Sequence, residues 1–161
     1  MRLVYLSILA IIIVTAAAFF LVPFKNPFVV KNSKEMPFGS SQEKASPSNY
    51  INASQIEIQD SRIIITIDNA SMGRFANTSS MMPLIDEDSN SIRIVPSSPE
   101  QIHVGDIITF EQDNILIVHR VIETGYDSNG WYATTKGDNT EQNDGKIRFE
   151  QIKYITIGIL Y

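Results

Sequence analysis

Hydrophobic and polar positions divide the chain into three stretches, and the first is almost wholly apolar. Residues 3–24 carry no charge, and only Ser7, Thr15 and Pro23 interrupt the apolar pattern. About 20 apolar residues are enough for a helix to cross a hydrocarbon core of about 30 Å. The pattern therefore predicts one transmembrane helix within residues 1–24.

The same segment has two features of a cleaved signal peptide, namely a basic Arg2 and three alanines at 16–18. The apolar part of such a peptide runs only about 7–15 residues, however. Here the apolar run continues past the alanines through residues 19–22. We therefore expect an uncleaved membrane anchor.

The basic residues that flank the anchor bear on its orientation. Arg2 precedes the segment, and Lys25, Lys31 and Lys34 follow it. Because cytoplasmic flanks are enriched in Lys and Arg, this count places the C-terminal part inside the cell. The function that we infer below requires it outside, so the two arguments give opposite topologies.

Residues 25–52 form a polar stretch with no sustained apolar period. Pro, Ser, Asn, Lys and Gln dominate it, a composition that buries too little apolar surface to fold alone. It predicts a tether that leads into a folded domain at residues 53–161. Asn-x-Ser/Thr sequences at Asn52, Asn69 and Asn77 could accept a glycan on an extracytoplasmic surface.

Short segments of alternating apolar or β-branched residues fill the remainder of the chain. Turn-forming residues separate them at 60–61, 112–114 and 129–130. A sustained helical period is absent from the sequence after residue 24. We therefore expect a mainly β domain, built as an antiparallel sheet or barrel. The expected strands are residues 55–58, 62–67, 92–95, 106–110, 115–123, 131–135 and 154–161.

Composition and charge argue against several classes of protein. The net charge is −5 and the pI is near 5.0, which disfavours a nucleic-acid-binding surface. The sequence has no cysteine, and His103 and His119 are its two histidines. A disulfide framework, a thiolate site and a multi-histidine zinc site are therefore not expected.

Candidate chemistry begins with Ser80, His119 and the two acids Asp138 and Asp144. A hydroxyl, an imidazole and a carboxylate are the parts of a serine hydrolase. Each also has a plain structural interpretation: a turn ending at Pro83, a half-buried strand histidine, and acids of a solvated loop. The other histidine, His103, is expected to be a surface residue.

A calcium loop is a further interpretation of the acidic stretch at residues 138–144. An EF-hand calcium loop begins with Asp at its first position and requires Asp or Asn at its third. Thr140 stands there. We therefore expect no metal site.

Four segments, taken in order, resemble the conserved boxes of a known family. They are Ser80–Met81–Met82–Pro83, Val104–Gly105–Asp106–Ile107–Ile108, His119–Arg120–Val121, and Thr135–Lys136–Gly137–Asp138–Asn139 with Asp144. Together they resemble a type I signal peptidase of the archaeal and endoplasmic-reticulum kind. The resemblance covers residues 79–161, and a single membrane anchor agrees with that family's layout.

The resemblance implies a role for each site residue. Ser80 would be the nucleophile, and His119 would be the base, at the place where bacterial members carry a lysine. Asp144 would orient His119, with Asp138 as a second acid or a structural support, and the sequence does not separate the two. The Ser80 N–H and the Thr78 hydroxyl would form the oxyanion hole. Lys136 accompanies its Gly-Asp pair and is not expected to act as the base.

The implied protein is a membrane-anchored serine endopeptidase on the extracytoplasmic face of the cell membrane. It would remove signal peptides from exported preproteins, with small side chains preferred at the first and third positions before the cut. It needs no cofactor. Its partners would be preproteins and membrane lipid, and the resemblance admits accessory membrane subunits.

Two other classes remain open at this point. One is an anchored β domain that has lost catalysis and binds peptides or protein partners. The other is a self-cleaving repressor-type Ser-Lys protease. His119 and the lack of a DNA-binding helical region argue against it.

Two departures from the family pattern also bear on the site. Ser79 replaces a residue that is often Gly, and the link at residues 84–104 is long enough to reshape a substrate groove.

Overall fold

The computed structural model describes residues 43–161, and the regular structure of this part is almost entirely strand. Within it, no helix is long and apolar enough to cross a membrane. The transmembrane helix expected at residues 1–24 lies outside the described residues. Three 3-10 helices are η1 (Ala53–Gln55), η2 (Pro99–Gln101) and η3 (Phe149–Gln151). The strands are β1 (Ile56–Gln59), β2 (Arg62–Ile65), β3 (Ser71–Arg74), β4 (Asn90–Ile94), β5 (Ile107–Gln112), β6 (Ile115–Asp127), β7 (Gly130–Lys136), β8 (Asn143–Ile147) and β9 (Ile152–Leu160).

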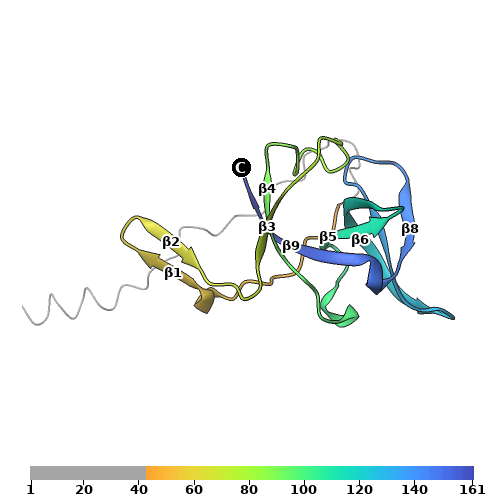
Figure 1. The fold of residues 1–161 in the computed structure, drawn as a ribbon, viewed down its shortest axis with the longest axis horizontal. Helices are drawn as coiled ribbons and strands as arrows, with labels where there is room; N and C mark the ends of the chain where they lie inside the picture. Colours follow the sequence, from red (N-terminus) through yellow and green to blue (C-terminus); the bar gives the residue numbers. More distant parts are fainter. Residues whose placement is uncertain (1–42) are drawn as a thin grey trace, which may run out of the picture. The chain divides into compact units, whose positions relative to one another are not determined.

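Seven of these strands form one sheet, in the order β3-β4-β9-β5-β6-β7-β8. Every neighbouring pair in it is antiparallel. The sheet curls into a half-barrel (Figure 1). The prediction of a mainly β, antiparallel domain is therefore confirmed.

Two hairpins in the middle of the sheet form where turn residues predict them. Asp113 and Asn114 join β5 to β6 with φ angles of 52° and 62°. Positive φ at both central residues is what a type I′ turn requires, and Asp and Asn tolerate it. Gly130 opens β7 with a φ of 100°, which glycine adopts without a steric cost. These turns set the register that places His119 opposite Ile108.

The alternation pattern misses two strands, β3 and β8. Both lie at the edges of the seven-stranded sheet, so each pairs with a single neighbour. Their sequences, Ser-Met-Gly-Arg and Asn-Asp-Gly-Lys-Ile, are mostly polar and exposed. An edge strand needs little apolar surface, and polar residues there discourage pairing with other chains.

The main core lies where β5 and β9 cross the centre of the sheet. Ile108, Phe110 and Ile155 are fully buried there, and Ile108 pairs directly with Ile155. A smaller cluster of Met81, Ile85 and Ile107 lies beneath the loop that follows β3. This second cluster bears on the candidate site because Met81 follows Ser80 in the chain.

Residues 43–52, which the sequence places in the tether, contact the sheet domain. The Ser48 N–H and the Tyr50 hydroxyl donate to the two oxygens of Asp106, at 2.8 and 2.5 Å. Asp106 is fully buried. Burial, the hydrogen bond to Asp106 and the negative charge of Asp106 raise the pKa of Tyr50 well above its ordinary value. A β-carbon at Gly105 would clash with the Ser46 carbonyl, so the two backbones touch.

β1 and β2 form a separate two-stranded hairpin. The cross-strand pairs Ile56–Ile65 and Ile58–Ile63 lie on one face of it. All four isoleucines are exposed. This hairpin takes no part in the sheet that carries the candidate site.

Replacing Ile155 by Ala tests the position of the main core. The substitution removes apolar contacts at a fully buried centre, so we expect a loss of about 2–5 kcal/mol in the free energy of unfolding. Urea unfolding of the full chain, followed by Trp131 fluorescence, measures it. Leu160→Ala, on the exposed end of the same strand, is the control and should change the value by less than about 1 kcal/mol. Equal losses for the two variants would contradict the assigned core.

Candidate active site

Ser80 lies in the loop between β3 and β4. Ser79, just before it, has a φ of 55°, in the left-handed region that favours glycine. This turn leaves Ser80 half-buried, while Met81 is buried in the smaller apolar cluster. The Ser80 hydroxyl lies 3.1 Å from the Thr78 hydroxyl oxygen. The burial of Met81 thus fixes the end of a turn that presents two hydroxyl groups.

His119 lies on β6, and its ring is held by an acid. Its Nδ1 is 2.6 Å from Oδ2 of Asp144, an oxygen that also accepts a hydrogen bond from the Thr135 hydroxyl at 2.7 Å. A carboxylate oxygen accepts, so Nδ1 must carry the hydrogen. In the neutral ring this leaves a lone pair on Nε2, as a general base needs.

Asp138 has a different partner. The Arg120 guanidinium donates to both of its carboxylate oxygens, from Nε at 2.8 Å and from the second terminal nitrogen at 2.7 Å. Burial opposes ionisation of Asp138, but hydrogen bonds and positive charge from Arg120 and Lys44 prevail. They hold the pKa of Asp138 below its ordinary value of 3.8. Of the two acids, Asp144 contacts the imidazole and Asp138 forms an ion pair.

The loop after β7 brings Ser80 close to His119. A β-carbon at Gly137 would lie 2.7 Å from the Ser80 carbonyl oxygen and 3.0 Å from His119 Nε2. Both groups therefore flank the same glycine, and only a residue without a side chain fits between them. The Asn139 N–H also donates to the Ser80 carbonyl, at 2.8 Å.

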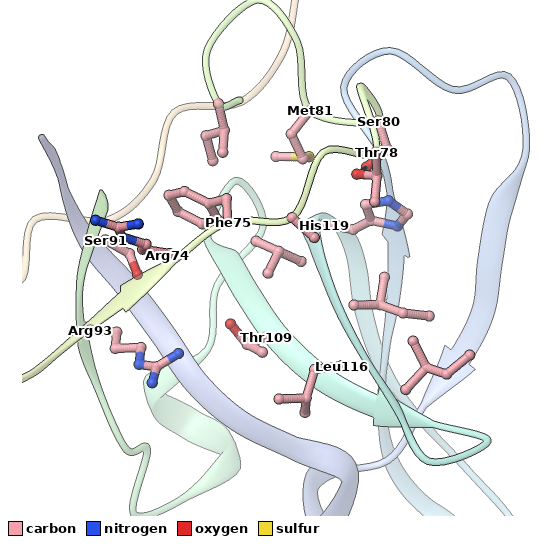
Figure 2. Close-up of a pocket in the computed structure, with 15 residues that line it drawn as sticks. Arg74, Phe75, Thr78, Ser80, Met81, Ser91, Arg93, Thr109, Leu116 and His119 are labelled. Atoms are coloured by element: carbon pink, nitrogen blue, oxygen red, sulfur yellow. Dashed lines mark hydrogen bonds between the residues drawn. The ribbon is translucent and has the colours of Figure 1, made fainter. Parts of the chain in front are cut away.

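Ser80 and His119 line one cavity of about 410 Å³ (Figure 2). In Figure 2 the Thr78 and Ser80 side chains lie above the His119 ring, and Arg74 and Arg93 lie on the opposite side of the cavity. Between these groups the lining of the cavity is mainly apolar. Its apolar lining comes from Phe75, Ala76, Met81, Ile85, Ile115, Leu116, Ile117 and Val118.

The arrangement has the parts needed for acyl transfer. Within residues 43–161, the Ser80 hydroxyl bonds to Thr78 and not to His119. Nucleophile–base hydrogen bonds are often long without substrate, so the shared cavity and the flanking of Gly137 are the relevant geometry. In the described part no acceptor takes the Ser80 N–H, which is available for an oxyanion.

Within residues 43–161, no group of three or more His, Cys, Asp or Glu side chains could hold a metal ion. His103 lies at the turn before β5, with its backbone N–H bonded to Asp106.

Of the residues that the sequence singles out, Thr78, Ser80 and His119 line one cavity, Asp144 contacts His119, and Asp138 pairs with Arg120. The structure adds four contacts that sequence reasoning missed, made by Thr135, Gly137, Asn139 and Lys44. The first three lie within the segment at 135–139. A Thr and a Gly close to an acid in that segment are the sequence features that could have identified these contacts. Lys44 gives no such signal, because it lies in a polar stretch far away in sequence.

The stretch at 84–104 contributes to the same cavity. It supplies β4, and through it Ser91 and Arg93, together with the buried Ile85. This stretch therefore forms part of the cavity that Ser80 and His119 line.

No protein-family model matches the chain, and no curated protein matches its sequence. The resemblance to signal peptidases therefore rests on the four sequence segments alone.

Asp138→Asn tests the ion pair with Arg120. Removing one partner of a buried pair leaves an uncompensated charge, so we expect a loss of about 3–5 kcal/mol in unfolding free energy at pH 7. In the wild type the folded-state pKa of Asp138 is lowered. The stability that this carboxylate contributes is therefore present above pH 3.8 and lost as the pH falls through the lower folded value.

The variant should consequently show a flatter dependence of unfolding free energy on pH below 3.8. Urea unfolding at a series of pH values measures it. Asp88→Asn, at an exposed position, is the control and should follow the wild-type curve. An Asp138→Asn curve that is parallel to the wild type would refute the lowered pKa.

Proposed function

We propose that the chain is a membrane-anchored serine endopeptidase that removes signal peptides from exported preproteins. One observation carries the proposal. The Asp144-bound imidazole of His119 lies on the same cavity as Ser80, and its Nε2 and the Ser80 carbonyl flank Gly137. The order and spacing of the four signal-peptidase-like segments support the substrate class.

The reaction would proceed by acyl transfer. Ser80 Oγ attacks the scissile carbonyl carbon while His119 Nε2 takes the hydroxyl proton. The Ser80 N–H and the Thr78 hydroxyl donate to the oxyanion that forms. His119 then gives its proton to the leaving amine as the C–N bond breaks. Water, deprotonated by His119, hydrolyses the resulting ester at Ser80.

Asp144 would act throughout on His119. Its bond to Nδ1 keeps the hydrogen on that nitrogen and leaves Nε2 free to accept. Its negative charge stabilises the imidazolium that forms in each half-reaction. The Thr135 hydroxyl holds the carboxylate in place.

The cavity and the predicted anchor favour a peptide substrate near a bilayer. An extended peptide could lie along the apolar lining formed by Phe75, Ile85 and Val118. A membrane anchor at residues 1–24 would hold the site where signal segments lie, which raises their effective concentration. The proposal requires the domain on the extracytoplasmic face, against the count of flanking basic residues.

Cleavage of a preprotein by the full chain in lipid vesicles tests the proposal. Ser80→Ala and His119→Ala should each lower the rate at least about 10³-fold, because the two groups act as a unit. Asp144→Asn should lower it by a factor on the order of 10²–10⁴, through the wrong imidazole tautomer. Gel analysis and mass spectrometry of the product give the rate and the cleavage site.

Ser79→Ala and His103→Ala are the matched controls and should keep the wild-type rate. Cleavage by Ser80→Ala at the wild-type site would exclude Ser80 as the nucleophile. If the folded wild type cuts no preprotein but retains one by binding, the anchored peptide-binding domain becomes the better account.

A further inference from the structure

Residues 44–50 form a segment, here called the strap, that contacts Gly105, Asp106, Arg120 and Asp138 of the sheet domain. Its C-terminal end is anchored on Asp106 through the bonds described above. Near its start it is anchored by Arg120, whose guanidinium donates to the Ala45 carbonyl at 3.1 Å. A segment that the sequence predicts to be a tether is therefore bonded to two buried groups of the sheet domain.

Lys44, at the start of the strap, reaches the acid that Arg120 holds. Its Nζ lies 3.7 Å from Oδ1 of Asp138 and also donates to the Asp138 backbone carbonyl. The Lys44 side chain is 49% exposed, whereas that of Asp138 is 6% exposed. Asp138 is thus held by a buried cation from β6 and by a half-exposed cation from the strap.

Asp138, which Lys44 contacts, and Asn139, the next residue, both contact the Ser80 turn. The Asn139 N–H donates to the Ser80 carbonyl at 2.8 Å, and its side-chain amide donates to the Ser79 carbonyl at 3.1 Å. The Asp138 N–H points to the Met81 sulfur at 3.4 Å. Two consecutive loop residues therefore contact the nucleophile turn at three consecutive positions.

We propose that Lys44 is a positioning residue for Ser80, acting from the strap through residues 138 and 139. The inference rests on the proposed function, since Ser80 must be the nucleophile for its position to affect turnover. Lys44 does not line the cavity around Ser80 and His119. Its loss should therefore lower kcat and leave KM nearly unchanged.

The half-exposed position of Lys44 adds a second expectation. Pairs at the surface are screened by salt, while buried pairs are screened much less. High salt should therefore weaken the contact of Lys44 with Asp138 and spare that of Arg120. The wild-type kcat should fall with salt toward the value of a variant that lacks the Lys44 cation.

The experiment compares Lys44→Ala, Lys44→Arg and Lys153→Ala in the full chain, in vesicles with a preprotein substrate. Lys153 is a matched control because its side chain is 38% exposed and pairs with Glu111 at 2.9 Å, and neither residue lines the cavity. We expect Lys44→Ala to lower kcat roughly tenfold, because small displacements of a nucleophile are costly. Lys44→Arg should restore most of the rate, and Lys153→Ala should match the wild type.

Hydrogen exchange of the backbone at residues 78–82, followed by mass spectrometry, gives a readout that needs no activity. Lys44→Ala should speed exchange there, while β5 and β9 keep their wild-type protection. If the wild type cuts no preprotein but Lys44→Ala still speeds exchange at 78–82, the proposed function fails and the positioning contact stands.

Two results would overturn the positioning role. One is a Lys44→Ala variant with wild-type kcat and wild-type exchange at 78–82. The other is a loss that Lys44→Arg does not restore, together with faster exchange across the whole sheet, because that pattern marks a general structural effect.

Discussion

The buried ion pair between Arg120 and Asp138 is the contact on which the rest of the candidate site depends. Arg120 follows His119 on β6, and Asp138 lies in the loop that leads to Asp144 on β8. The guanidinium also donates to the Gly105 carbonyl, and so ties β6 to the turn before β5. Removing either partner would leave an uncompensated charge in the interior. One pair therefore fixes the loop that leads to Asp144 and contacts the Ser80 turn.

The two acids have different partners. The carboxylate of Asp138 accepts from Arg120 and lies 3.7 Å from Lys44. The carboxylate of Asp144 contacts the His119 imidazole and the Thr135 hydroxyl. The structure thus separates the acid that holds the loop from the acid that contacts the imidazole.

The sequence predicts the sheet interior well because alternation and turn residues are local signals. The β5–β6 hairpin and His119 on an apolar strand follow from them. The edge strands β3 and β8 could not be predicted because their side chains bury little surface, and Ser71–Arg74 has no apolar face. The separate partners of Asp138 and Asp144 could not be predicted either, since both acids lie in one polar stretch of the sequence. The contact of Lys44 with Asp138 depends on tertiary structure alone, because their positions differ by 94 in the sequence.

The central claim is that Ser80 is the group that becomes acylated when His119 takes its proton. Acid quenching of the full chain during turnover of a preprotein, followed by mass mapping of the covalent adduct, tests it most directly. The account predicts an acyl group on Ser80 in the wild type and none in His119→Ala. An adduct on Ser79 or on another side chain, or one that forms equally in His119→Ala, would contradict it.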